Sequence, residues 1–522
     1  MAGRLDDHSA NDLKAAAELG MAPAFWAARQ PDEVAIFEMS GPTRTFGALN
    51  ANANRIARLL RAEGLRPGDA VALLCPNRAE FVDVLFATQR CGLRMTPVNW
   101  HLTPEEIAYV IDNCEAKALF ADASVPGASQ AAEQCPRLIL KVAVGAPLPG
   151  FLDYEAALAP HSAEDIADPA RGHTMLYSSG TTGRPKGVYK PNAPIPTYDP
   201  AYQDDDVHFC TGPAYHASPM AGDVRRALVN GVPTVLLDKW DNEKVLATIE
   251  ARRVTRSHFV PIMFQRLLGL PPEVRGRYDL SSLRRISHGA APCPPEVKQA
   301  MIEWLGPVLF EYYAGSEGGV GFWVTSQDWL KKPGTVGKRP DPAAAKILDE
   351  AGNELSSGQP GTIYMRLADQ GGFEYFKDSA KTDSGRRDGY FTMGDVGYFD
   401  EDGYLFLTGR SAETIIVGGV NIYPQEIDNE LIKHPAVADS CTVGVPHAEY
   451  GEEVRAVIEL AAGYDPSDAL KDEILAYART AVAKYKIPRG VDFVPRLPRS
   501  EAGKIQRNKV RAPYWEGRSR AI

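Results

Sequence analysis

Hydrophobic positions along the first 170 residues alternate between helical and strand-like spacing. Leu49, Ala53, Ile56 and Leu60 recur at the three- and four-residue intervals of a helix. The turn sequence GLRPGD and the apolar run AVALLC follow, which predict a loop and then a strand. EFVDVLFATQRCG predicts another helix and MTPVNW another short strand. This alternation predicts layered α/β architecture with largely parallel strands.

The pattern changes after the sequence TGR at residues 408–410. TVGVP and VRAVIEL predict short strands in βαβ-like units, separated by a charged loop, and a helix is expected from Asp465 to Ala483. The remaining stretch of about 110 residues is long enough for a small α+β domain. We therefore place a domain boundary just after Arg410, between residues 1–410 and 411–522.

Composition and charge narrow the functional classes. The formal net charge of −10 argues against general nucleic-acid binding. The seven cysteines are scattered without metal-ligand spacing, and no stretch has the length of a membrane helix or a secretory signal, so a cytoplasmic location is expected. From Lys484 onward, eleven basic residues face three acidic ones, which gives +8. This basic tail is either a solvated face or a partner for an anionic, phosphate-bearing substrate.

The most informative segment is YSSGTTGRPKG at residues 177–187. Its glycines permit turns that are closed to other residues, its hydroxyls can donate hydrogen bonds to phosphate, and two cations follow. The P-loop pattern G-x-x-x-x-G-K-[ST] is absent. A flexible linker is the alternative, but linkers do not usually follow a strand-like run directly or end in PKG. The segment therefore predicts a phosphate-binding loop.

YSSGTTGRPKG resembles the signature loop of the adenylate-forming superfamily, which includes acyl-CoA synthetases, luciferase and the adenylation domains of peptide synthetases. The resemblance runs through essentially the whole chain in the expected order. It implies a large N-terminal domain of α/β subdomains with a β-barrel-like part, and a small mobile C-terminal lid. It also implies nucleotide contacts by Ser178, Ser179, Gly180, Thr182, Gly183, Lys186, Gly289, Ala290, Ala291, Pro292, Tyr312, Tyr313, Ala314, Gly315, Ser316, Asp395 and Arg410.

The segment YYAGSE at residues 312–317 is similar to the family motif that binds adenine and metal. By this resemblance Tyr313 stacks on adenine, Ser316 contacts phosphate, and Glu317 holds Mg²⁺ together with Thr181. An aromatic face suits a purine, and a carboxylate beside phosphate oxygens suits Mg²⁺. A surface acid at 317 is the alternative. A packed turn is the alternative for residues 289–292, which the resemblance places along the adenine.

By this resemblance, Asp395 accepts hydrogen bonds from the ribose hydroxyls, and Arg410 supports the ribose and the phosphate. In isolation the pair Gly394-Asp395 would indicate only a turn. Lys504, within PRSEAGKIQR, resembles the family's catalytic lysine, which bridges the substrate carboxylate and the α-phosphate; an ordinary exposed lysine is the alternative. Ala412 stands at the hinge position that usually carries Asp or Lys, so the timing of domain rotation is in doubt.

Two further segments concern the acyl acceptor and the acid. Gly418 and Gly419 would line the channel for the pantetheine arm of coenzyme A, unless they only form a tight turn. His216, in TGPAYHASP, resembles the gate beside the substrate carboxylate, although a lone histidine is more often structural. Ala217 replaces the aspartate of members that activate amino acids, which argues against an amino-acid substrate.

The expected pocket wall consists of Met220 and the ranges 258–263 and 287–289, which are mainly apolar. They favour a fatty, aromatic or polycyclic acid, although the same alternation suits a buried strand. The predicted activity is an acid–thiol ligase that uses ATP, Mg²⁺ and coenzyme A, with Lys504, Glu317, His216 and Thr181 in the chemistry. Loading of a separate carrier protein and a non-catalytic adenylate sensor are the rival functions. A homodimer is left open.

Overall fold

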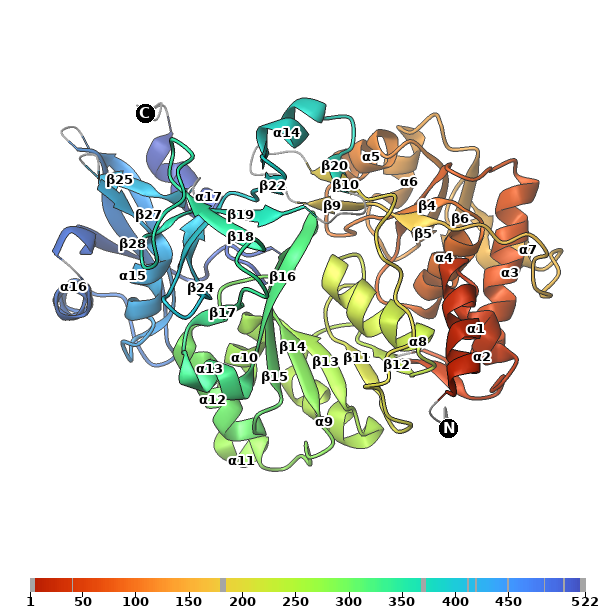
Figure 1. The fold of residues 1–522 in the computed structure, drawn as a ribbon, viewed down its shortest axis with the longest axis horizontal. Coiled ribbons are helices and arrows are strands. Elements are labelled where there is room, and N and C mark those ends of the chain that lie inside the picture. The colour runs from red at the N-terminus through yellow and green to blue at the C-terminus, as the bar shows by residue number, and fades with distance from the viewer. Residues whose placement is uncertain are drawn as a thin grey trace.

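The computed structural model describes residues 5–39, 41–178, 185–367, 372–410, 413–417, 420–447, 450–482, 484–500 and 503–516. The N-terminal helices and the first sheet lie at one end of the molecule, and the C-terminal domain lies at the other (Figure 1). The strands between them belong to a second large sheet and to an antiparallel part. The predicted mixed α/β architecture, with a large N-terminal and a small C-terminal domain, is confirmed.

The first sheet is parallel, in the strand order β7-β6-β5-β3-β4-β8. Its strands are β3 (Ala70–Leu74), β4 (Arg94–Pro97), β5 (Ala116–Asp122), β6 (Leu140–Val144), β7 (Leu152–Asp153) and β8 (His173–Thr174). The helices before and between these strands are α1 (Asp7–Glu18), α2 (Ala22–Ala27), α3 (Phe46–Ala62), α4 (Ala79–Arg90), α5 (Pro104–Asn113), α6 (Ala128–Glu133) and α7 (Tyr154–Leu158). All of α4 except Glu80 is buried, since this helix is apolar on most of its faces. The predicted helices and the strand AVALLC are therefore confirmed.

The second sheet has the order β16-β15-β14-β13-β11-β12-β1-β2 and is parallel from β15 to β1. Its strands are β1 (Val34–Glu38), β2 (Arg44–Thr45), β11 (His208–Cys210), β12 (Thr234–Leu236), β13 (Arg256–Phe259), β14 (Arg285–His288), β15 (Leu309–Gly315) and β16 (Gly318–Thr325). The associated helices are the π-helix η1 (Pro219–Arg226), α8 (Ala227–Val229), α9 (Asn242–Arg252), α10 (Pro261–Leu268), α11 (Pro272–Arg275), α12 (Pro295–Leu305) and α13 (Ser326–Lys331). One core cluster joins residues of both sheets, so the two layers share a hydrophobic interior.

The third part of the N-terminal domain is antiparallel, and its closure into the predicted β-barrel-like part stays a prediction. Its larger sheet contains β17 (Thr335–Lys338), β18 (Ala345–Leu348), β19 (Gly361–Arg366), β21 (Arg386–Arg387), β22 (Tyr390–Phe391), β23 (Asp395–Phe399) and β24 (Tyr404–Arg410). A separate three-stranded sheet contains β9 (Leu176–Ser178), β10 (Lys186–Tyr189) and β20 (Glu374–Tyr375), with α14 (Ser379–Ser384) following β20. This small sheet carries both flanks of the predicted phosphate loop.

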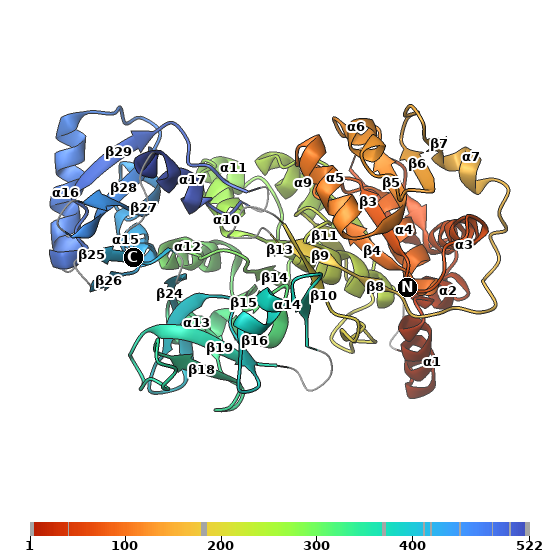
Figure 2. The same ribbon diagram turned by 90° about the horizontal axis from the view of Figure 1, so that it is seen from above.

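The C-terminal domain packs two helices on a small sheet with its own core (Figure 2). Its elements are β25 (Ile415–Val417), β26 (Val420–Ile422), α15 (Pro424–Leu431), β27 (Val437–His447), β28 (Gly451–Leu460), α16 (Asp468–Ala481), η3 (Lys484–Lys486), β29 (Gly490–Val494), α17 (Arg507–Arg511) and η4 (Ala512–Trp515). The predicted helix from Asp465 is confirmed as α16. The βαβ-like pairing of TVGVP with VRAVIEL is wrong, because β27 and β28 form an antiparallel hairpin. A short loop cannot make the crossover that parallel strands need.

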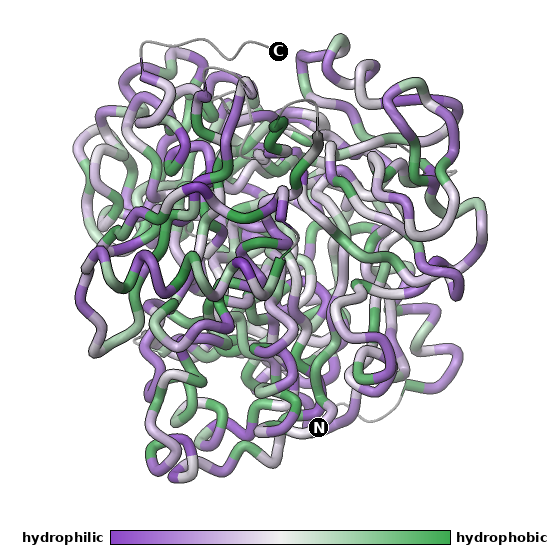
Figure 3. Tube along the Cα trace, turned by 90° about the vertical axis from the view of Figure 1, so that its left-hand side faces the viewer, coloured by the Kyte–Doolittle hydropathy of each residue, from purple (hydrophilic) through white to green (hydrophobic). Residues whose placement is uncertain are grey.

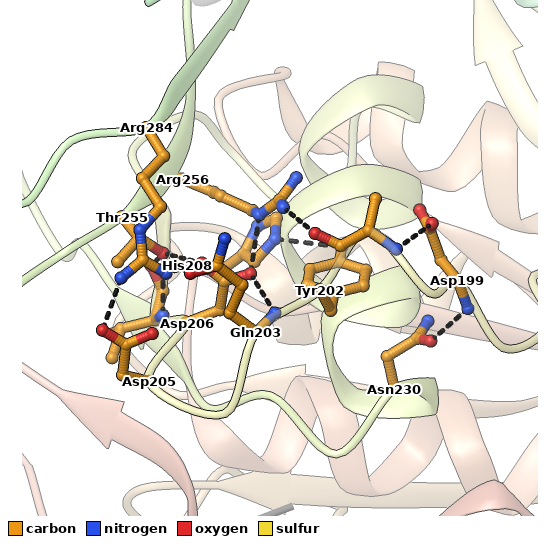
Figure 4. A network of polar contacts seen from close by, with 12 residues as sticks. Asp199, Tyr202, Gln203, Asp205, Asp206, His208, Asn230, Thr255, Arg256 and Arg284 are labelled. Atoms are coloured by element: carbon orange, nitrogen blue, oxygen red, sulfur yellow. Dashed lines mark hydrogen bonds and ion pairs between the residues drawn. The ribbon is translucent and has the colours of Figure 1, made fainter. Parts of the chain in front are cut away.

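Between β10 and β11 the chain has no helix or strand over residues 190–207. A polar network fastens the end of this segment to the second sheet (Figure 4). Asp206 accepts hydrogen bonds from Arg256 Nε and Arg284 Nη1, each at 2.9 Å. Asp199 pairs with Arg226 of η1 at 2.6 Å. Asp206 and Asp199 therefore tie the segment to the second sheet and to η1.

Apolar and polar stretches alternate through the molecule and do not gather in one long apolar run (Figure 3). Within the described residues, no helix has the length and apolarity that crossing a bilayer requires. All seven cysteines are free thiols, and six are buried, which agrees with the prediction of buried thiols.

Candidate active site

Strands β23 and β24 bring together the two residues predicted to bind ribose. Asp395 and Arg410 are direct partners across the antiparallel pair, and Arg410 Nε lies 3.0 Å from Asp395 Oδ1. Tyr313 Oη donates a hydrogen bond of 2.8 Å to Asp395 Oδ2. Burial, together with the charge of Asp395, holds the pKa of Tyr313 well above its usual value, so the phenol stays a donor. These three residues form one polar cluster.

Lys504 of the C-terminal domain reaches this same cluster. Burial lowers the pKa of Lys504, the charge of Arg410 lowers it further, and Asp395 opposes both. Its backbone forms a tight turn, in which Ser500 N donates to Lys504 O at 2.7 Å and Gly503 has φ +75°. A Cβ atom on Gly503 would collide with Ile262 at the start of α10. The turn is therefore packed against the N-terminal domain, and the charges of Arg410 and Asp395 act on Lys504.

Glu317 lies in the tight connection between β15 and β16, where Gly315 and Gly318 face each other. Gly318 has φ +95°, a conformation that favours glycine. Tyr375 Oη donates a hydrogen bond of 3.0 Å to Glu317 Oε1. Lys190 is close to the same turn, because a Cβ atom on Gly318 would lie 3.8 Å from Lys190 Nζ. Burial lowers the pKa of Lys190, and the negative charge of Glu317 opposes that shift. Glu317 thus sits between a phenol and a cation.

The fit of Glu317 to a magnesium ion depends on what else would bind the ion. The described residues contain no group of three or more His, Cys, Asp or Glu side chains that could hold a metal alone. Mg²⁺ commonly takes one or two protein carboxylates and completes its coordination with phosphate oxygens and water. A single carboxylate beside a phosphate loop fits that requirement.

The predicted gate residue His216 lies near a second histidine, His258. His258 Nε2 lies 2.8 Å from Tyr312 Oη, and Tyr312 Oη donates to Ser218 Oγ at 2.6 Å. Burial lowers the pKa of both His216 and His258 to about 4, with further lowering by the charge of a neighbouring histidine. Both imidazoles are therefore neutral at pH 7, and His258 Nε2 is the donor toward Tyr312.

The strand end at residues 289–292 approaches the neighbouring strand β15 closely. A Cβ atom on Gly289 would lie 2.6 Å from the carbonyl oxygen of Tyr312, and Ala290 has φ +66°. Because Gly289 has no side chain, its backbone can pack directly against β15. Close packing of Gly289 against β15 is what the packed-turn alternative expects, and the contact of residues 289–292 with adenine stays a prediction.

Several predicted residues lie outside the described residues. They are Ser179, Gly180, Thr181, Thr182 and Gly183 of the phosphate loop, Ala412 at the hinge position, and Gly418 and Gly419 of the pantetheine channel. The flanks of the loop are described: Ser178 and Lys186 are direct partners across β9 and β10. Lys186 Nζ lies 5.8 Å from the ring centroid of Tyr375, the residue bonded to Glu317. The loop flank and the Glu317 turn are therefore close in space.

Sequence reasoning did not single out Tyr375, Lys190 or Ser218. Tyr375 is 58 residues from Glu317, and nothing in its local sequence marks it as a partner. Lys190 follows the PKG motif by only a few residues, and its charge was the one available signal. Ser218 lies within the gate segment, but its bond to Tyr312 depends on the packing of η1 against β15.

Comparison with known proteins decides the family. The model of AMP-binding enzymes matches residues 24–369, and that of the AMP-binding enzyme C-terminal domain matches residues 426–504. The chain belongs to the AMP-binding enzyme family. The resemblance to the adenylate-forming superfamily is thereby confirmed. The interval between the two matches contains Arg410, so the domain boundary after Arg410 stays a prediction.

Relatives of this AMP-binding enzyme cover nearly its whole length. Feruloyl-CoA synthase of an Amycolatopsis species is 31% identical, over 95% of this chain and 99% of the relative. Indoleacetate–CoA ligase of Aromatoleum aromaticum is 30% identical, over 90% and 92%. The ATP-bound crystal structure of MatB from Rhodopseudomonas palustris has a TM-score of 0.80 at 29% identity, covering 95% and 99%. This AMP-binding enzyme is an AMP-forming acid–CoA ligase by class.

Proposed function

We propose that the enzyme activates a fatty, aromatic or polycyclic carboxylic acid with ATP and transfers the acyl group to coenzyme A. In the first half-reaction the carboxylate oxygen attacks the α-phosphorus of ATP, and pyrophosphate leaves. In the second, the thiolate of coenzyme A attacks the carbonyl carbon of the mixed anhydride, and AMP leaves. Charge develops on phosphate oxygens in the first step, so positioned cations and donors are the main requirement.

The observation that carries this proposal is the position of Lys504 beside Asp395 and Arg410. A lysine with a lowered pKa, held in a turn against the N-terminal domain, is placed to neutralise charge between a carboxylate and a phosphate. In our proposal Asp395 accepts the ribose hydroxyls and Arg410 supports ribose and phosphate. Tyr313 offers its ring to adenine while its hydroxyl stays on Asp395. Glu317 and Thr181 would hold Mg²⁺, which neutralises phosphate charge when bound.

The acid would enter beside His216 and the Tyr312–Ser218 pair. Neutral imidazoles and a phenol at this point offer hydrogen bonds without a fixed negative charge, which suits an incoming carboxylate. Met220 is buried in the shared core, and in our proposal it forms part of an apolar pocket wall. Domains 1–410 and 411–522 would move relative to each other between the half-reactions, with Gly418 and Gly419 beside the pantetheine arm.

The test is a product analysis with ATP and Mg²⁺, a panel of aliphatic, aromatic and steroid-like acids, and coenzyme A present or omitted. We expect a thioester mass that requires both ATP and coenzyme A, with AMP released in equal amount. If acyl-adenylate and pyrophosphate form without a thioester, the acyl acceptor is a carrier protein and not coenzyme A. ATP binding without pyrophosphate release from any acid would support an adenylate sensor and overturn the ligase proposal.

A further inference from the structure

The π-helix η1 connects the proposed acid site with an unusual basic residue. Its sequence ends in two adjacent arginines, Arg225 and Arg226, and it begins just after Ser218, which bonds to Tyr312. π-helical turns are rare and are frequent at functional sites. The two arginines offer a direct comparison, because they share one helix end and differ in what surrounds them.

Arg226 is exposed and paired, whereas Arg225 is half-buried and unpaired. The guanidinium of Arg226 contacts the carboxylate of Asp199 at 2.6 Å. Arg225 forms no ion pair or hydrogen bond with any part of the chain that the structure describes, and its Nε is fully buried. A buried N–H group without an acceptor is unfavourable. Within the described residues, the Nε–H of Arg225 therefore has an unmet need for an acceptor, which an anion could supply.

The charged groups that act on Arg225 are cations. Burial and the charge of Arg171 lower the pKa of Arg225 to about 10, and the charge of Arg225 in turn lowers the pKa of Lys190. The carboxylate that acts on Lys190 is Glu317, which already accepts a hydrogen bond from Tyr375. Lys190 lies beside the Gly318 turn, and among the described residues Glu317 is the carboxylate whose charge acts on it, whereas none acts on Arg225.

This basic cluster, Arg171, Lys190 and Arg225, is displaced from the phosphate loop. The loop leaves and re-enters the small sheet at Ser178 and Lys186. Lys190 lies four residues beyond Lys186, which corresponds to roughly 13 Å along an extended strand. Lys190 therefore lies just past the end of β10 that is remote from the loop, beside the Glu317–Gly318 turn.

Open space lies next to the cluster on the same helix. A Cβ atom on Gly222, three residues before Arg225, would have no heavy atom of another residue within 4 Å. Tyr312 and Ser218 stand at the beginning of that helix, where we place the reacting carboxylate. An acid bound there could extend along η1 toward Arg225.

We propose that Arg225, supported by Lys190 and Arg171, binds a second anionic group of the acid, a carboxylate or a sulfonate at the end remote from the reacting carboxylate. The substrate would then be an acid with an apolar body and an anion at each end. This inference rests on the proposed function, because it assumes that the acid is activated beside His216. It goes further by assigning the remote end of the acid a charge.

The experiment compares matched acids in the wild type and two variants. The pairs are benzoate with terephthalate, benzoate with 4-sulfobenzoate, hexanoate with adipate, and cyclohexanecarboxylate with cyclohexane-1,4-dicarboxylate. We expect kcat/KM to favour the doubly charged acid in at least one pair. Arg225→Met should lower kcat/KM for that acid by roughly 10²-fold and reduce its preference over the singly charged partner correspondingly. Arg226→Met, the matched control, should leave the preference unchanged.

Two readouts separate this inference from the ligase proposal. If no acid is activated, the ligase proposal fails. The inference is then decided by the rise in unfolding temperature that terephthalate or 4-sulfobenzoate causes in the wild type but not in Arg225→Met. If acids are activated without preference for a second charge in any pair, the inference is overturned and the ligase stands. If Arg225→Met lowers kcat/KM equally for both acids of a pair and raises the KM for ATP, Arg225 binds the triphosphate, and the inference is also overturned.

A measurement without ligand tests the unpaired state of Arg225 itself. Removing a buried charge that has no partner should stabilise the protein, so Arg225→Met should raise the unfolding temperature in buffer. Arg226→Met, which breaks an exposed ion pair, should change it little. A lowered unfolding temperature in Arg225→Met would mean that the protein satisfies Arg225 internally, and the anion subsite would be wrong.

Discussion

Lys504 and its neighbours show how single residues acquire their properties from distant parts of the chain. An exposed lysine keeps an ordinary pKa, but burial beside Arg410 lowers that of Lys504 and makes its proton easier to share with a phosphate. Asp395 limits the shift. The same residue-scale effect keeps His216 and His258 neutral, because burial and the charge of a neighbouring histidine lower the pKa of each.

The first prediction at this scale concerns Lys504→Ala. We expect normal folding and a loss of roughly 10²–10³-fold in the rate of pyrophosphate release, comparable with the loss of one preorganised stabilising contact. Lys509→Ala, on the exposed face of the neighbouring helix α17, is the control and should be unaffected. Single-turnover pyrophosphate release measures both. Near-normal release by the Lys504 variant would remove Lys504 from the adenylation step.

The second residue-scale prediction concerns stability at low pH. The pKa of His258 falls from 6.5 to about 4 on folding, so the unfolded chain binds more protons between these values. The free energy of unfolding should therefore fall as pH drops from about 6.5 to about 4, by up to about 1.4 kcal/mol per pH unit for each such histidine. Urea unfolding from pH 7 to 4.5 should show a shallower slope for His258→Gln than for the wild type. An unchanged slope would contradict the assignment.

At the scale of elements, strand ends decide which groups can meet. The antiparallel pair β23–β24 places Asp395 opposite Arg410, and the β15–β16 turn places Glu317 next to Tyr375. The parallel neighbours β14 and β15 end beside each other, with Gly289 against the backbone of Tyr312. The site is thus assembled from strand termini, which is common in sheets with parallel strands.

The prediction that belongs to this scale is Gly289→Ala. The added methyl group would lie 2.6 Å from the carbonyl oxygen of Tyr312, so β14 and β15 must separate. We expect a loss of about 1–3 kcal/mol in stability and a raised KM for ATP. Gly321→Ala on the neighbouring β16 is the control, since the nearest atom to its Cβ is 4.0 Å away. Equal stability and equal KM for ATP in both variants would show that close approach of Gly289 to Tyr312 is not required.

For the whole molecule, the relation between the two domains determines whether Lys504 is in the site. Two of the contacts between the domains are the packing of Gly503 against Ile262 and an ion pair of 3.3 Å between Lys433 and Glu296 of α12. Helix α15 also packs against β24. Both members of the ion pair are partly exposed, so the pair stabilises this arrangement by at most about 1 kcal/mol. An ion pair of this strength would not prevent the domain movement that we propose.

The corresponding prediction separates the two half-reactions. Lys433→Glu should slow pyrophosphate release several-fold, because like charges would then face each other across the interface, and the double variant with Glu296→Lys should recover it. Thioester formation from preformed acyl-adenylate should not change. Lys471→Glu, in an exposed pair with Asp468 of the same domain, is the control. A slower second half-reaction in Lys433→Glu would mean that the domains keep this interface throughout.

The sequence by itself determined the family, the nucleotide motifs and the helices and strands with strong periodicity. Those signals are local: the α3 and α4 patterns repeat within one element, and YSSGTTGRPKG and YYAGSE are contiguous. The βαβ-like interpretation of the C-terminal strands was wrong, because an apolar strand pattern does not indicate whether two strands pair parallel or antiparallel. The phosphate loop and the pantetheine channel stay predictions.

The tertiary structure alone decided which distant side chains share a site. The bond from Tyr313 to Asp395 joins residues 82 apart, and that from Tyr375 to Glu317 joins residues 58 apart. Arg225 and Arg226 are identical neighbours in the sequence, yet within the part of the chain that the structure describes Arg226 has a carboxylate partner and Arg225 has none. The physical reason is that burial and pairing depend on how all the layers pack together, and a local sequence pattern does not contain that information.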